Sequence, residues 1–156
     1  MGKPVEALEY ETMLLTRHTY LNNLRSGPDG QLDRSAYLLL SRLELDGPLS
    51  IGQLSEAFGL DASTLNRQTK AMMKADLVQR IPDPDGGIAR KFQITEHGSI
   101  RLRGVREVST ARLTKIVDDW SADELEAFVS MLARFNHDIE RLVGRPWPRP
   151  ERAVQL

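Results

Sequence analysis

The chain contains no cysteine among its 156 residues. This absence excludes disulfide scaffolds, thiolate metal sites, cysteine nucleophiles and thiol-based sensing of oxidants. The sequence also lacks an apolar run near the ~20 residues that a membrane-spanning helix needs. Acidic residues follow the N-terminus, where a secretory signal would place an apolar block. We therefore expect a cytoplasmic protein that has no contact with a membrane.

The net charge is small, only −1, but the charges are segregated along the chain. Residues 62–92 carry a net charge of +3, residues 99–117 carry +4, and residues 118–143 carry −5. The basic segments suit a polyanion such as nucleic acid, because binding depends on where the positive potential lies and not on its sum. The alternative is that these charges only cover the solvated faces of amphipathic helices.

Residues that could carry catalysis are few and scattered. The three histidines, His18, His97 and His137, lie on different predicted elements and lack the spacing of a metal-binding motif. The sequence has no nucleophile elbow and no phosphate-binding glycine loop. Capping and solvation explain the paired acids beside the helix ends. We predict neither an enzyme, nor a metal site, nor a cofactor.

Four helices are predicted in the first half of the chain. Apolar residues at spacings of three and four indicate a helix over residues 5–25, which a Gly-Pro-Asp-Gly segment ends. Ser50 and Asp61 are suited to cap two later helices at their N-termini. The three later helices cover residues 33–45, residues 50–58, and residues from Asp61 or Ala62 to Ala75.

Two short strands and two long helices are predicted in the second half. Residues 77–81 and 89–95 form strands joined by a turn rich in proline, glycine and aspartate, which predicts a β-hairpin. A helix capped by Thr95 runs to about residue 119. Ser121 and Glu124 form a capping box at the start of the last helix. The proline-rich tail that follows cannot be helical and is expected to be extended or disordered.

The order helix, helix, short helix, helix, hairpin is that of a winged helix-turn-helix module. We therefore predict a mainly α fold with a small β-hairpin wing, flanked by N- and C-terminal dimerisation helices. In such a module the second helix of the turn enters the major groove of DNA, and the hairpin reaches the backbone or the minor groove.

The polar face of the helix over residues 62–75 has the side chains that such a role needs. They can hydrogen-bond base edges and phosphates, and no acidic residue interrupts them. They are Ser63, Thr64, Asn66, Arg67, Gln68, Lys70 and Lys74. On the hairpin, Arg90 and Lys91 are candidates, but neighbours on a strand point to opposite faces, so we expect at most one to reach DNA. A generic polar helix surface is the alternative interpretation.

Four short motifs make the sequence similar to the MarR (multiple antibiotic resistance regulator) family of transcription factors. They are Gln53-Leu54-Ser55-Glu56-Ala57-Phe58-Gly59-Leu60, Ser63-Thr64-Leu65-Asn66-Arg67, Leu77-Val78-Gln79-Arg80 and Ile94-Thr95-Glu96-His97-Gly98. The resemblance covers residues from about Leu38 to Gly98. It implies a homodimer in which residues 1–32 and 95–156 form the helical dimerisation region, intertwined with a winged module of residues 33–94. It also implies a pseudo-palindromic duplex as the target, with Ser63, Thr64, Asn66 and Arg67 in contact with DNA.

The chain departs from the family pattern at two places. Asp76 stands where the family usually has a glycine after the helix, and aspartate tolerates a left-handed backbone at a modest cost. At the tip of the wing, Asp85 is followed by Gly86 and Gly87, so the tip arginine of the family is missing. Arg90, further along the hairpin, is the residue that could substitute for it.

The flanking helices argue for a dimer without the family. Their apolar stripes need a partner surface, and two-fold symmetry would set two recognition helices about 34 Å apart on DNA. A monomer whose terminal helices pack on its own module is the alternative.

We therefore predict a homodimeric, sequence-specific DNA-binding regulator, most simply a repressor. The resemblance implies that small aromatic acids enter a crevice beside the winged module and release the DNA. Arg17 and His18 are candidates to meet such an anion, although a histidine among leucines is more often an interface residue. The alternative function is a winged-helix adaptor that does not bind DNA and docks a protein through Phe92, Trp147 and the proline-rich tail.

Overall fold

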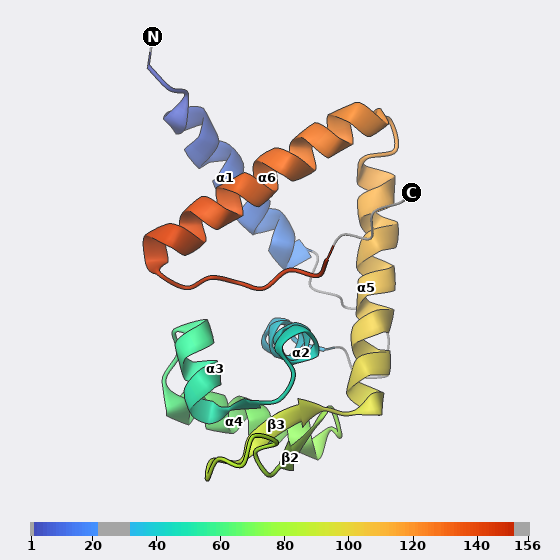
Figure 1. The fold of residues 1–156 in the computed structure, drawn as a ribbon. Helices are drawn as coiled ribbons and strands as arrows, with labels where there is room; N and C mark the ends of the chain where they lie inside the picture. Colours follow the sequence, from blue (N-terminus) through green and yellow to red (C-terminus); the bar gives the residue numbers. More distant parts are fainter. Residues whose placement is uncertain (1, 22–31, 152–156) are drawn as a thin grey trace.

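A computed structural model of the protein describes residues 2–21 and 32–151. These residues form six helices and a three-stranded sheet (Figure 1). The elements are α1 (Val5–Leu21), α2 (Arg34–Asp46), β1 (Leu49–Ser50), α3 (Ile51–Phe58), α4 (Ala62–Lys74), β2 (Val78–Ile81), β3 (Lys91–Ile94), α5 (Glu96–Ile116) and α6 (Ala122–Val143). This order confirms the predicted mainly α fold with a wing. Residues 22–25, predicted as the end of the first helix, lie outside the described residues.

Local side chains fix where most helices begin. Each N-cap residue has an extended backbone, and its side-chain oxygen accepts a hydrogen bond from an amide of the first turn. Ser50 and Ser121 belong to complete capping boxes, with Gln53 and Glu124 as their partners. The N-caps of α2 to α6 are Asp33, Ser50, Asp61, Thr95 and Ser121. The predicted caps at Ser50, Asp61, Thr95 and Ser121 are confirmed.

The sheet differs from the predicted two-stranded hairpin. A third strand, β1, pairs antiparallel with β3, with Leu49 opposite Phe92, so the strand order is β1-β3-β2. Two residues carry no periodicity, which is why the sequence alone did not show this strand. The second strand of the hairpin is also shorter than predicted, so Arg90 lies in the loop just before β3.

One hydrophobic core holds α2, α3, α4, the sheet and the start of α5 together. We call residues 33–94, from the N-cap of α2 to the end of β3, the winged module. Its largest fully buried side chains are Leu39, Leu40, Leu54, Leu65 and Phe92, and Leu102 of α5 joins them. On the surface above this core, Arg106 of α5 forms an ion pair with Glu44 of α2 at 2.5 Å. The first half of α5 is therefore fixed to the winged module.

Two backbone positions let α4, the sheet and α5 meet closely. Asp76, after α4, has φ = 58° and its carbonyl accepts a 2.6 Å hydrogen bond from the Thr95 hydroxyl. The predicted left-handed conformation at Asp76 is thus confirmed. At Gly98, a Cβ atom would lie 2.2 Å from the Leu77 carbonyl oxygen, so only glycine fits there. The glycine of the Ile94–Gly98 motif allows α5 to cross the end of β2.

Helices α1 and α6 lie apart from the winged module. Figure 1 shows them crossing each other at the end of α5 that is distant from the sheet. None of the residues of α6 is buried, and neither is any described side chain of α1. No helix in the described ranges is long and apolar enough to cross a membrane. After α6, residues 144–151 have no regular secondary structure, in agreement with the predicted absence of helix, and run back between α6 and the winged module.

Candidate nucleic-acid interface

Helix α4 is anchored by one face and presents the other to solvent. Leu65 is fully buried and Met72 is 4% exposed, so the helix cannot rotate without losing core contacts. Thr69 is also buried, and its hydroxyl donates a 2.8 Å hydrogen bond to the Leu65 carbonyl. These three residues form the buried face of α4. The opposite face is therefore held at a fixed angle to the core.

The predicted contact residues of α4 lie on or beside that outer face. Thr64 and Gln68 are half-buried, and Gln68 borders a hollow of about 340 Å³ between α2 and α4. The helix contains no acidic residue. The other predicted contact residues are all exposed: Ser63, Asn66, Arg67, Lys70 and Lys74. This face can donate hydrogen bonds to base edges and phosphates without charge repulsion.

Asp61 orders the first turn of α4. Its carboxylate accepts hydrogen bonds from the Thr64 amide at 2.9 Å and from the Ser63 hydroxyl at 3.1 Å. Hydrogen bonds from the side chain and then the amide of Thr64, followed by that from Ser63, lower the pKa of Asp61 below its ordinary value. A carboxylate at a helix N-terminus is stabilised further by the helix dipole. The end of α4 that would face base edges is thus fixed before any partner arrives.

The wing separates the two candidate cations, Arg90 and Lys91. The Nζ atom of Lys91 lies 3.2 Å from Asp83 Oδ1 and 4.0 Å from Asp85 Oδ2, whereas Arg90 is exposed in the loop before β3. Asp83 also accepts a hydrogen bond from the Asp85 amide, which, ahead of the contact with Lys91, lowers its pKa. Of the two candidates, Arg90 is the one whose charge remains available. No local pattern indicated the Asp83–Lys91 pair, because the pair spans an irregular turn.

The sequence of this chain matches known regulators. A sequence model of the MarR family matches residues 32–86. The chain is also 38% identical over 134 residues to YxaD of Bacillus subtilis (strain 168), an uncharacterized HTH-type transcriptional regulator; the match covers 85% of this chain and 93% of YxaD. The chain belongs to the MarR family. It is therefore a DNA-binding transcriptional regulator with a winged helix-turn-helix.

Solved structures share the fold of this MarR-family chain. A MarR family protein from Bacillus stearothermophilus superimposes with a TM-score of 0.72 at 21% identity, covering 89% of this chain and 99% of that one. FabT of Streptococcus pneumoniae, solved in complex with DNA, gives a TM-score of 0.72 at 15% identity, covering 90% and 99%. The predicted family and fold class are thus confirmed.

The two candidate ligand residues, Arg17 and His18, do not line the same hollow. His18 borders an apolar hollow of about 560 Å³ between α1 and α6, formed largely by Leu15, Phe128 and Leu132. Arg17 is exposed and does not belong to that lining. Among the described residues, no group of three or more histidine, aspartate or glutamate side chains could hold a metal ion.

The structure contradicts one residue of the adaptor alternative. Phe92 is only 1% exposed, packs in the core and has the Arg80 guanidinium 5.5 Å above its ring. It cannot dock a partner, because its ring lies among the core side chains and is closed to solvent. Trp147, the other aromatic residue of that hypothesis, is half-buried against the protein's own Phe58 and Arg42.

Proposed function

We propose that this MarR-family regulator is a cytoplasmic homodimer that binds a pseudo-palindromic operator and represses transcription there. The observation that carries this proposal is the outer face of α4, whose cationic and uncharged polar side chains are exposed and whose inner face is fixed in the core. A structural neighbour, FabT, was solved in complex with DNA. A repressor of this kind acts by occupying promoter DNA.

The contacts divide between bases and phosphates. Arg67 and Asn66, one turn into α4, are the residues suited to bidentate hydrogen bonds with guanine and adenine. Lys70 and Lys74 extend along the same face and suit phosphates, as do the hydroxyls of the first turn. Arg90 of the wing supplies the cation that reaches the neighbouring backbone or minor groove.

The apolar faces of the terminal helices support the dimer. Phe128 is 48% exposed, Met131 is 64% exposed and Phe135 is 37% exposed, and all three border the hollow between α1 and α6. Apolar surface of this extent is characteristic of association between subunits. A second copy of the chain, related by two-fold symmetry, would cover these faces and place two α4 helices about 34 Å apart.

The effector is the remaining part of the proposal. A hollow of about 550 Å³ lies between α6, the following tail and the winged module, bordered by Leu38, Ile139 and Arg145. Its apolar sides and its cation suit a small anionic or aromatic ligand. A ligand held at this junction would lower DNA affinity by changing how the winged module sits relative to α6. His18 and Arg17 remain a second candidate place for the anion.

The recognition face is tested with duplexes that the protein itself selects from a random-sequence library. In fluorescence anisotropy, Arg67→Ala should weaken binding to a selected duplex by about 1 to 3 kcal/mol. The matched control is Arg141→Ala on α6, where the side chain is exposed and pairs with Asp138 on the same helix. Unchanged affinity for Arg67→Ala would remove α4 as the recognition helix, and affinity that does not fall with salt would exclude a phosphate-dominated interface.

A further inference from the structure

The segment after α6 returns to the winged module and packs on it; we call residues 144–151 the strap. Gly144, with φ = 69°, ends α6 and turns the chain. The ring of Trp147 then stands edge-on against Phe58 of α3, with the ring centroids 5.2 Å apart, and the Arg42 guanidinium of α2 lies 4.9 Å from its centroid. Edge-to-face and cation–π contacts of this kind are each favourable beyond the area they bury.

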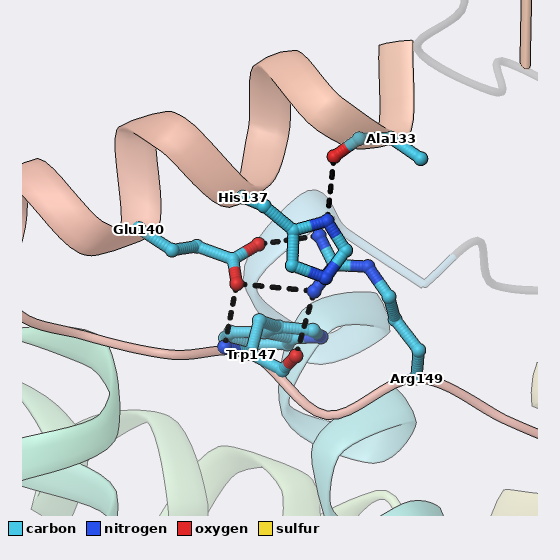
Figure 2. A network of polar contacts seen from close by, with 5 residues as sticks. All are labelled: Ala133, His137, Glu140, Trp147 and Arg149. Carbon is cyan, nitrogen blue, oxygen red and sulfur yellow. Dashed lines mark hydrogen bonds and ion pairs between the residues drawn. The ribbon is translucent and has the colours of Figure 1, made fainter. Parts of the chain in front are cut away.

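Glu140 of α6 holds the other side of the strap (Figure 2). Its two carboxylate oxygens accept hydrogen bonds from both terminal nitrogens of Arg149, at 2.5 and 3.0 Å, and one of them also accepts the Trp147 amide at 3.1 Å. The Arg149 guanidinium donates to the Trp147 carbonyl as well, at 2.9 Å. Bidentate pairs between arginine and carboxylate are the geometrically most specific of ion pairs. The strap is therefore tied to α6 by Glu140 and to the winged module by Trp147.

A third contact places the strap at the end of α3. A Cβ atom on Gly59 would lie 2.6 Å from Arg145 Cζ, so the guanidinium passes directly over this glycine. Gly59 is the left-handed C-cap of α3, where the helix dipole favours a cation. The strap thus meets the first helix of the helix-turn-helix at two successive residues, Phe58 and Gly59.

These contacts add a direct link between α6 and the winged module, which α5 also connects. The first half of α5 packs on α2 through Leu102 and Arg106, and α6 begins only after the distant end of α5. None of the residues of α6 is buried. Without the strap, the winged module could therefore tilt relative to α6 about the long helix α5. Through Trp147 and Arg149, the strap links the far end of α6 back to the winged module. The helices α5 and α6 and the strap then form the three sides of a triangle (Figure 1).

We propose that the strap fixes the angle between α6 and the winged module and thereby sets which spacing of operator half-sites the dimer accepts. This role rests on the proposed function as a dimeric DNA-binding protein. One added base pair moves a half-site by about 3.4 Å and rotates it by about 35°. A rigid angle therefore excludes altered spacings, whereas a tilting module follows them. Trp147, Arg149 and Glu140 are positioning residues that touch no DNA.

The first test uses duplexes selected by the unsubstituted protein, with the two half-sites at the selected spacing or moved apart by two base pairs, and a duplex with one half-site. The unsubstituted protein should bind the altered spacing about tenfold more weakly, and Trp147→Ala and Arg149→Ala should narrow this difference to about threefold. Affinity for the single half-site should not change. Arg141→Ala, which removes an exposed arginine from α6 just before the strap, should behave like the unsubstituted protein.

The second test measures the angle itself, without DNA. Because the chain has no cysteine, Glu56→Cys on the exposed side of α3 provides one spin-label site per subunit. The label-to-label distance distribution in the dimer should be narrow, and Trp147→Ala should broaden it. Thermal unfolding followed by circular dichroism verifies that both variants fold; Arg149→Ala removes only a surface side chain and serves if Trp147→Ala does not fold.

The outcomes separate the two proposals. Duplex binding with spacing discrimination unchanged in both variants, or an unbroadened distance distribution, overturns the role of the strap and leaves the proposed function intact. Equal losses of affinity for the single half-site and for both spacings also overturn it, because a general defect in DNA binding would then explain the result. Failure of the unsubstituted protein to bind any duplex overturns the proposed function and the strap's role with it.

Discussion

Asp83 holds the ammonium of Lys91 at 3.2 Å across the turn of the wing, and both side chains are largely covered, at 13% and 12% exposure. This pair neutralises the charge of Lys91, the first residue of β3. Arg90, its neighbour, remains exposed. A pair of adjacent cations in the sequence is thus, in the folded wing, one structural ion pair and one available charge.

Arg90→Ala should therefore weaken binding to all duplexes to a similar degree and reduce the slope of log affinity against log salt by about 1. The physical reason is the loss of one released counterion without the loss of a base contact. Anisotropy titrations at several salt concentrations measure both values, with Arg141→Ala as the control. An unchanged slope would show that the wing cation does not reach the DNA backbone.

Leu132→Asp should convert the proposed dimer into monomers. Leu132 is 36% exposed and borders the hollow between α1 and α6, so the substitution would put a charge into the proposed interface, where an unpaired charge costs several kcal/mol. Sedimentation velocity at micromolar concentration measures the change. Ser130→Asp, on an exposed polar position of the same helix, introduces the same charge and should remain dimeric. If both variants sediment as dimers, this face of α6 is not the interface.

Asp76→Ala should be less stable than Asp76→Gly by about 1 kcal/mol, because the Cβ atom of alanine is crowded in a left-handed backbone that glycine, which has no Cβ, adopts freely. The hydrogen bond from Thr95 ends on the backbone carbonyl of Asp76 and is kept in both variants. Urea unfolding gives the difference. Asp119→Ala, which removes an exposed acid at an ordinary backbone conformation, controls for charge. Equal stability of the alanine and glycine variants would contradict strain at this position.

The strap should stay closed throughout the neutral and mildly acidic range. The hydrogen bonds from Arg149, followed by that from the Trp147 amide, lower the pKa of Glu140 from 4.5 to about 2. A carboxyl whose pKa is lower in the folded state stabilises it above its unfolded pKa, and the contribution is lost as the pH falls from about 4.5 towards about 2.

Fluorescence of Trp147 in a Trp120→Phe background measures this behaviour, because these are the two tryptophans of the chain. The emission should be constant from pH 8 to about pH 5, at the upper edge of the range where an ordinary glutamate titrates. Glu140→Gln should shift it already at neutral pH, since a neutral amide binds the guanidinium weakly. Emission that changes between pH 8 and pH 5 would contradict this expectation. His137, one turn before Glu140, donates its own hydrogen bond from Nδ1 to the Ala133 carbonyl (Figure 2).

Features that depend on neighbouring residues could be predicted from the sequence. The caps Ser50, Asp61 and Ser121 act within one helical turn, so the residue types at spacings of three are enough to place them. The same holds for α4, because the spacing of Leu65 and Met72 decides which face is buried and so which face can meet DNA. This is why the candidate recognition face, and the family, followed from motifs alone.

Features that join distant parts of the chain were decided by the tertiary structure. Phe92 could be an exposed aromatic anchor as far as the sequence shows, and only the packing of the helices on its face of the sheet buries it. Trp147 in a proline-rich tail has no periodicity, yet it packs on helices about a hundred residues earlier. The sequence by itself determined the elements and the polarity of each face, because these depend on local spacing. The folded chain decided which charges pair and where the strap binds, because those contacts depend on distances that no local pattern encodes.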